Sequence, residues 1–209
     1  MDNYWNDCYW PRHLAEPERM DIFEDLWIRK HKTLIDELEK GHVLDLGCGI
    51  GQFTDYWIRS GFQVVSGDIS ANALNALKAR TPSANTIALD MRQPLPFSDG
   101  TFDVVFANLS IHYFDEKTTL ALSREIHRIL KPGGLFMGSV NSSAAYEIVK
   151  DKATLLEENY YRIGPRSIRL FDRAQFDHFF GKFHTLHLEE IRTVRFRNQR
   201  DHWEFVFRK

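Results

Sequence analysis

The stretch Val43-Leu44-Asp45-Leu46-Gly47-Cys48-Gly49-Ile50-Gly51 decides the fold. Its apolar first half predicts a short buried strand, and its alternating glycines predict a tight turn whose backbone can approach a ligand closely. A helix is expected to follow through about Ser60, where Gly61 ends it. Because a helix N-terminus presents unpaired N–H groups, the turn is a candidate binding site. Such a turn also joins strand to helix in any doubly wound fold, so it does not identify a ligand alone.

Strands and helices alternate after this turn. The helix that follows the second strand has Ser70 as its N-cap and runs to about Arg80, and a later helix starts after Asp115. Alternation of this kind predicts βαβ units and a mainly parallel α/β sheet. Strands are expected over residues 43–46, 62–67, 86–89, 102–107 and 135–140, with Lys131-Pro132-Gly133-Gly134 as the break before the last of them.

The flanks of this core are less regular. Residues 18–39 predict an amphipathic helix that Gly41 ends, with Phe23, Trp27, Leu34 and Leu38 on one face. Beyond the core we expect a helix over 142–158, an irregular piece over 159–170, a helix from the capping pair Asp172 and Gln175 to Gly181, and antiparallel strands over 184–196 and 202–208. The core-facing residues of these strands are Val194, Phe196, Trp203, Phe205 and Phe207.

Two acidic residues follow the second and third strands. Asp68 stands 21 residues beyond Gly47, where a carboxylate in this architecture accepts hydrogen bonds from ribose hydroxyls. Asp90 ends the third strand, where it can meet an exocyclic amino group of adenine. A nicotinamide dinucleotide is the competing ligand, but its fingerprint requires a further glycine where this chain has Gln52. The mismatch favours a ligand without a pyrophosphate.

These motifs together resemble those of class I S-adenosylmethionine-dependent methyltransferases, particularly the small-molecule methyltransferase-domain group. The matching segments are 43–51, Asp68, the pair Asp90-Met91, the approach to the fourth strand at Leu95–Val105, and the turn Leu130–Gly134. The resemblance covers about residues 18–141. It implies a Rossmann-like, seven-stranded, mainly parallel sheet of order 3-2-1-4-5-7-6, with strand seven antiparallel and helices on both faces.

The resemblance also implies a cofactor site for S-adenosylmethionine, with S-adenosylhomocysteine as its product. Asp45 would order the glycine turn, Asp68 would hold the ribose, and Asn108 would offer its carbonyl to the cofactor's ammonium group. Cys48 would be a small filler in the turn and not a nucleophile. The implied cofactor-binding residues are Asp45, Gly47, Cys48, Gly49, Gly51, Asp68, Ile69, Asp90, Met91 and Asn108.

The acceptor would face the stretch after the fourth strand. His112 is the candidate general base there, because an unperturbed imidazole titrates near neutrality; the alternative is a packing residue beside the cofactor. The aromatic N-terminus is either a lid or an anchor on the sheet. The basic, aromatic stretch over 160–169 suggests an anionic or aromatic acceptor, or a solvated loop. The substrate candidates are Tyr9, Trp10, Tyr113, Arg162 and Arg166.

Composition sets the remaining expectations. The chain has 209 residues, a net charge of −2 and a pI of about 6.5, which gives no global attraction for nucleic acid or anionic membranes. Two cysteines, Cys8 and Cys48, do not make a disulfide framework. Arginines near the C-terminus are a weak hint of nucleic acid, and the nine histidines show no metal-ligand spacing, so no metal is expected.

These observations predict a cytoplasmic enzyme of one domain, with no membrane segment, as a monomer or homodimer. Within it, residues 1–40 would form a lid and helix, 41–141 the cofactor-binding core, and 142–209 an acceptor-side insertion and terminal β-hairpin. The predicted reaction is methyl transfer from S-adenosylmethionine to an O, N, S or C atom of a small-molecule acceptor. The alternatives are an RNA methyltransferase, a non-catalytic cofactor-binding protein of the same fold, and an NAD-dependent enzyme.

Overall fold

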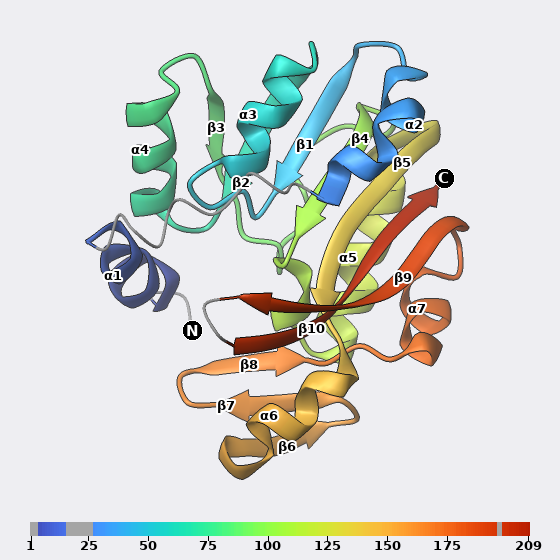
Figure 1. The fold of residues 1–209 in the computed structure, drawn as a ribbon. Helices are drawn as coiled ribbons and strands as arrows, with labels where there is room; N and C mark the ends of the chain where they lie inside the picture. The colour runs from blue at the N-terminus through green and yellow to red at the C-terminus, as the bar shows by residue number, and fades with distance from the viewer. Residues whose placement is uncertain (1–3, 16–26, 196–197) are drawn as a thin grey trace. The chain divides into compact units, whose positions relative to one another are not determined.

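The computed structural model describes residues 4–15, 27–195 and 198–209 (Figure 1). A seven-stranded sheet has the order β3-β2-β1-β4-β5-β10-β9, and a second sheet has the order β6-β7-β8. Among the strands of the large sheet, β9 is the sixth along the chain and β10 the seventh, so the predicted order 3-2-1-4-5-7-6 is confirmed. Strand β10 runs antiparallel to β5, as expected. The chain divides into two compact units, residues 1–89 and 90–209.

The first unit holds the amino-terminal half of the Rossmann-like sheet. Strand β1 pairs in parallel with β2, and β2 in parallel with β3. Leu44 and Trp57 are fully buried between strands and helices. The described elements are a π-helical turn (Tyr4–Tyr9), α1 (Trp10–Leu14), a 3-10 turn (Trp27–His31), α2 (Lys32–Asp36), β1 (His42–Leu46), α3 (Gln52–Arg59), β2 (Gln63–Asp68), α4 (Ala71–Arg80) and β3 (Asn85–Ala88).

The second unit completes the sheet and adds the small one. An aromatic cluster that includes Phe136, Phe180, Phe205 and Phe207 packs helix α7 against β5 and β10. The described elements are β4 (Phe102–Asn108), α5 (Glu116–Ile129), β5 (Leu130–Asn141), α6 (Tyr146–Val149), β6 (Ala153–Glu157), β7 (Tyr160–Ile163), β8 (Arg166–Arg169), α7 (Arg173–Phe180), β9 (His184–Arg195) and β10 (Asn198–Arg208), with 3-10 turns over Ile111–Tyr113, Ser143–Ala145 and Lys150–Lys152.

Three helix caps predicted from the sequence are confirmed. The side chain of Ser70 accepts the N–H of Ala73 at the start of α4. Asp115 accepts the N–H of Thr118 at the start of α5, and Asp172 accepts the N–H of Gln175 at the start of α7. Each of these oxygens satisfies a backbone donor that the first turn of a helix leaves unpaired.

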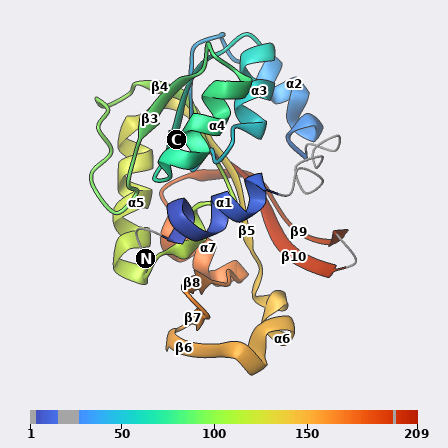
Figure 2. The same ribbon diagram turned by 90° about the vertical axis from the view of Figure 1, so that its left-hand side faces the viewer.

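The segment after β5 corrects two predictions. The expected helix over 142–158 ends at Lys152, and β6 follows it; the expected irregular piece over 159–170 contains β7 and β8. Asn159 and Gly164 adopt positive φ values of 55° and 57°, which allows the chain to reverse between these short strands. Figures 1 and 2 show β6, β7, β8 and α6 lying together beyond the end of β5.

The insertion over residues 142–171 leaves and returns to the sheet at one point. Ser142 and Phe171 form an isolated parallel bridge. The N–H of Phe171 donates to the carbonyl of Asn141 at 2.8 Å, and the N–H of Ser143 donates to the carbonyl of Phe171 at 2.7 Å. Two backbone hydrogen bonds therefore close the neck of the insertion.

Other boundaries differ from expectation. The helix predicted over 18–39 ends at Asp36, and its residues 18–26 lie outside the described residues, with Phe23 among them. The break at 131–134 lies within β5, where it bulges between the pairs Phe102–Leu130 and Val104–Leu135. Of the predicted core positions, Phe205 and Phe207 are buried; Phe196 and the side chain of Val194 lie outside the described residues. None of the helices in the described residues is long and apolar enough to cross a bilayer.

Candidate cofactor and acceptor residues

The glycine turn after β1 has the backbone that the sequence requires of it. Gly47, Gly49 and Gly51 have φ values of 75°, 53° and 79°, a region that side chains with a Cβ rarely enter. The N–H groups of Gly47 and Cys48 donate to the carbonyl of Gly67 at 2.7 and 3.0 Å, which ties the turn to β2. Gly51 then starts helix α3.

Asp68 ends β2 and is bound to this turn. Its Oδ2 accepts the N–H of Gly49 at 2.8 Å, and its Oδ1 accepts the N–H of Ser70 at 2.8 Å. The side chain is buried, and burial raises the pKa of its carboxyl while the backbone N–H groups oppose the rise. Each carboxylate oxygen has two lone pairs, so each can still accept a hydroxyl hydrogen. These two hydrogen bonds therefore fix the position of the Asp68 carboxylate relative to the glycine turn.

Asp45 lies behind the turn. It is 3% exposed, and its Oδ2 accepts the hydroxyl of Thr54 on α3 at 2.6 Å. That hydroxyl lies 2.9 Å from the hydroxyl of Ser66 on β2. Burial raises the pKa of Asp45 from 3.8 to about 7, and the nearby charge of Asp68 adds to the rise. Asp45 therefore joins β1, α3 and β2 beneath the glycines, which fits the predicted ordering role.

The raised pKa of Asp45 predicts a pH-dependent stability. Below pH 3.8 the folded and unfolded states both hold the proton; between 3.8 and about 7 only the folded state does, so stability falls as pH rises through this window. The shift corresponds to at most about 4 kcal/mol. Urea unfolding at pH 5 and pH 8 is expected to show a smaller loss of stability in Asp45→Asn than in the wild type. Equal losses in both proteins would refute the assignment.

Cys48 has the properties of a filler. Burial, with the charges of Asp45 and Asp68, raises the pKa of its thiol well above the ordinary value. A thiol that stays protonated at neutral pH is a poor nucleophile. Ile69, the predicted adenine neighbour, is half-buried after β2.

The aromatic N-terminal segment contacts the turn. A Cβ built on Gly49 would lie 2.5 Å from Cζ2 of Trp10, so the indole rests on this glycine. The side-chain oxygen of Asn6 accepts the N–H of Asn72 at 3.1 Å at the start of α4. Tyr9 stacks on His13, with ring centroids 3.9 Å apart. The structure thus brings Trp10, one of the two N-terminal substrate candidates, to the glycine turn, through a docking contact of Asn6 that the sequence did not reveal.

The predicted adenine pair lies in the second unit. Asp90 accepts Nη2 of Arg92 at 2.6 Å, and this hydrogen bond lowers the pKa of its carboxyl. Met91 is half-buried. Asn108 ends β4, and its Oδ1 accepts the hydroxyl of Ser139 at 2.7 Å. The cofactor roles of all three residues stay predictions.

His112 follows β4 in a 3-10 turn and is 1% exposed. Burial lowers the pKa of its imidazole to about 3, and the charge of Arg166 adds to the effect. The reason for choosing it as a base, titration near neutrality, therefore does not hold in the structure. Its Nε2 lies 3.1 Å from Nδ2 of Asn141, which can only donate, so the ring hydrogen is on Nδ1. Among the described residues Nδ1 has no hydrogen-bond partner.

Of the remaining substrate candidates, Tyr113 and Arg166 lie near His112 and Arg162 lies in the small sheet. The rings of His112 and Tyr113 are 4.3 Å apart, and the carbonyl of Tyr113 accepts the hydroxyl of Tyr160 on β7 at 3.2 Å. Arg166 on β8 is near enough to act on the imidazole, whereas Arg162 donates to Ser167 at 3.1 Å within the small sheet. Sequence reasoning missed Asn141, although its place at the end of a strand was a usable signal.

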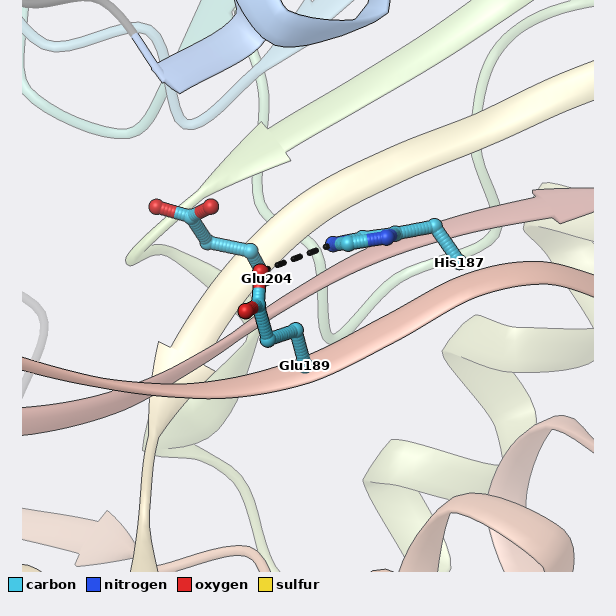
Figure 3. A group of neighbouring side chains, drawn as sticks. All are labelled: His187, Glu189 and Glu204. Carbon is cyan, nitrogen blue, oxygen red and sulfur yellow. Dashed lines mark ion pairs between the residues drawn. The ribbon is translucent and has the colours of Figure 1, made fainter.

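A group of possible metal ligands lies on the terminal hairpin (Figure 3). His187, Glu189 and Glu204 each offer an atom within 4.8 Å of the others. Glu189 and Glu204 are cross-strand partners, and Nε2 of His187 lies 3.6 Å from Oε2 of Glu189. A His-x-Glu pattern occurs on both strands and was the overlooked signal. His187 and Glu189 form an ion pair while the imidazole is protonated, and the prediction of no metal stays a prediction.

Comparison with known proteins finds similarity to methyltransferases. A family model described as a methyltransferase domain matches residues 44–138. An uncharacterized methyltransferase of Synechocystis sp. is 40% identical over 45% of this chain and 44% of its own length. A malonyl-[acyl-carrier protein] O-methyltransferase of Hamiltonella defensa is 34% identical over 49% and 39%, and the mitochondrial arginine-hydroxylase NDUFAF5 of Homo sapiens is 28% identical over 66% and 41%. The chain thus spans less than half the length of these relatives.

Solved structures agree in fold. An S-adenosylmethionine-dependent methyltransferase from Methanosarcina mazei has a TM-score of 0.74 at 16% identity, covering 85% of this chain and 96% of its own. Another from Clostridium acetobutylicum has a TM-score of 0.69 at 17% identity, covering 97% and 99%. Residues 44–138 thus match a methyltransferase domain, and the sheet that contains them has the fold of the class I S-adenosylmethionine-dependent methyltransferases.

Proposed function

We propose that this chain binds S-adenosylmethionine and moves its methyl group to a small-molecule acceptor. The observation that carries the proposal is the bond from the N–H of Gly49 to Asp68, which fixes a carboxylate beside a turn that has glycine at three of its five positions. When bound, the cofactor supplies a methyl group on a positively charged sulfur. The chain's own task is then to hold two reactants in line, which alone lowers a barrier substantially.

The residues of the first unit fit the cofactor. The two buried oxygens of Asp68 accept backbone N–H groups and retain lone pairs for the two hydroxyls of a ribose. Gly47, Gly49 and Gly51 carry no side chains of their own, so the backbone of the turn can approach the amino-acid part closely. Trp10, resting on Gly49, gives an aromatic surface that shields this place from water. Asp90, Met91 and Asn108 complete the proposed set on the basis of the family resemblance.

We further propose an acceptor that presents an oxygen atom or an anionic group to the second unit. In this proposal His112 is a neutral hydrogen-bond donor through Nδ1 and not a base, since its pKa is about 3. Arg166 supplies the positive charge near it. The names of relatives such as the malonyl-[acyl-carrier protein] O-methyltransferase support an acceptor of this kind. The net charge of −2 speaks against RNA as the acceptor.

A thermal-shift experiment tests the cofactor part. S-adenosylhomocysteine at about 100 times its dissociation constant stabilises a fold by about 2.7 kcal/mol. For a chain of this size we expect the melting temperature to rise by roughly 5–10 °C. S-adenosylmethionine should act similarly, and NAD at the same concentration should have no effect. A shift with NAD alone, or with none of the three, would reject the proposal. Radiolabelled methyl transfer to candidate carboxylates and phenols then tests the acceptor.

A further inference from the structure

A pocket of about 210 Å³ lies in the second unit, where the small sheet meets helices α5 and α7. Its volume is far larger than the ~30 Å³ that one water molecule occupies. Glu116 comes from the start of α5, Glu157 from the end of β6, and Arg169 from the end of β8. The lining residues are Glu116, Glu157, Glu158, Arg169, Asp172, Ala174, Gln175, His178 and Phe179.

Negative charge dominates this lining. Four carboxylates face one permanent cation, Arg169, which is 2% exposed and donates to Oε2 of Glu157 at 2.9 Å. Nε2 of His178 lies 2.8 Å from Oε1 of Glu116, an ion pair while the imidazole is protonated. Asp172 accepts Nδ2 of Asn159 at 2.8 Å and the N–H of Gln175 at 3.0 Å, both of which are neutral donors. The lining therefore keeps a negative excess that a cation would neutralise.

Gln175 is an independent sign of a ligand. The residue is 9% exposed and belongs to the lining of the pocket, yet its Oε1 has no hydrogen-bond partner among the described residues. A buried carbonyl oxygen without a donor is costly, so such oxygens are normally paired. An N–H group entering the pocket would satisfy this oxygen and approach the carboxylates together.

The spacing favours an organic cation over a metal ion. A metal binds ligand oxygens within about 2.6 Å, which requires the ligands to gather closely. Within the described residues, the group of His, Asp and Glu side chains that gathers closely enough is on the terminal hairpin and shares no residue with this pocket. Phe179 adds an apolar wall to the lining. Hydrogen-bond acceptors that lie apart from one another, next to the ring of Phe179, suit a flexible molecule with nitrogen groups at its ends.

We propose that this pocket binds a small organic cation that carries an ammonium or guanidinium group. Its N–H donors pair with Oε1 of Gln175 and with the carboxylates of Asp172 and Glu158, and its carbon chain packs on Phe179. The site is separate from the proposed cofactor residues, and its occupancy requires no S-adenosylmethionine. Arg169 also donates to the carbonyl of Phe114 at 3.4 Å, at the end of the turn that contains His112. An occupant of the pocket would therefore lie next to a residue that holds this turn in place.

Isothermal titration calorimetry on the full chain without cofactor tests the proposal. The probes are agmatine and putrescine, with 1,4-butanediol as the neutral control and MnCl₂ as the metal arm. Agmatine or putrescine should bind with an affinity that falls as salt is added. Butanediol should release no heat, and Mn²⁺ should not compete. Binding of butanediol at equal strength, displacement by Mn²⁺ at equal concentration, or no heat with either amine would overturn the proposal.

Variants locate the binding. Gln175→Leu, which removes the unpaired oxygen at similar volume, is expected to weaken amine binding about tenfold. Glu158→Gln, at an exposed position, should weaken it about threefold. Glu147→Gln is the matched control, because Glu147 is an exposed acid on α6 that pairs with Lys150 away from the pocket. Circular dichroism verifies folding. Equal affinity in Gln175→Leu and Glu158→Gln, or an equal loss in Glu147→Gln, would place the amine elsewhere and refute the site.

Discussion

Asp68→Asn is expected to weaken the binding of S-adenosylhomocysteine about 100-fold, because a hydrogen bond from a ribose hydroxyl to a charged carboxylate is stronger than one to a neutral amide by roughly 1–1.5 kcal/mol, and two such bonds are affected. The variant should remain folded: the amide oxygen can keep one of the two backbone N–H bonds that the carboxylate accepts from Gly49 and Ser70. Isothermal titration calorimetry measures the affinity directly. Asp68→Ala is a less informative change, because it leaves both buried N–H groups without an acceptor.

The matched control for this prediction is Asp36→Asn. Asp36 lies in the same unit, is half exposed and pairs with Lys32 and Lys40 on the surface. The substitution removes the same charge and is expected to leave cofactor affinity within about twofold, since exposed pairs contribute little. If both variants bind equally well, Asp68 does not hold the ribose, and the cofactor site has to be assigned elsewhere.

Gly49→Ala is expected to abolish detectable cofactor binding and to destabilise the chain by about 2 kcal/mol. Part of the cost comes from the backbone, which has a φ of 53° at this residue. The rest comes from the new Cβ, which would lie 2.5 Å from the rigid ring of Trp10. Calorimetry gives the affinity, and urea unfolding gives the free energy.

Gly61→Ala separates the two causes. Gly61 has a φ of 88°, but its nearest neighbour would be a Lys40 carbon at 3.8 Å, so alanine there meets only the backbone cost. We expect Gly61→Ala to bind cofactor normally. In a Trp10→Ala background, the cost of Gly49→Ala should fall to that of Gly61→Ala while binding stays lost. Normal binding by Gly49→Ala in either background would show that the turn does not meet the cofactor.

The strands and helices of the large sheet could be predicted from the sequence because the patterns that indicate them are local. Each core strand is a short apolar run that ends at a glycine, an acid or an asparagine, and the caps Ser70, Asp115 and Asp172 mark helix starts regardless of tertiary contacts. The family motifs then supplied the strand order, which no local pattern contains. The topology is confirmed, and the similarity to methyltransferases agrees with the predicted cofactor class; the roles of individual site residues stay predictions.

The strands of the insertion could not be predicted from the sequence, because they carry almost no local signal. Leu155 and Leu156 are 63% and 44% exposed on consecutive positions of β6, so the strand lacks the alternation that indicates one buried face. The turn residues Asn159 and Gly164 were its only local marks. The properties of His112 were hidden too, because its pKa depends on burial and on Arg166, which is distant in sequence. Contacts such as Trp10 on Gly49 likewise exist only in the folded chain.

The closed neck at Asn141–Ser143 and Phe171 bears on how such proteins diversify. Because the two hydrogen bonds that join the ends run between backbone atoms, they do not depend on which side chains stand in the loop between the ends. Evolution can therefore lengthen, shorten or replace that loop as a cassette while the parent scaffold keeps its register. The same loop can be exchanged in engineered chimeras, and the two hydrogen bonds mark where the exchanged segment should begin and end.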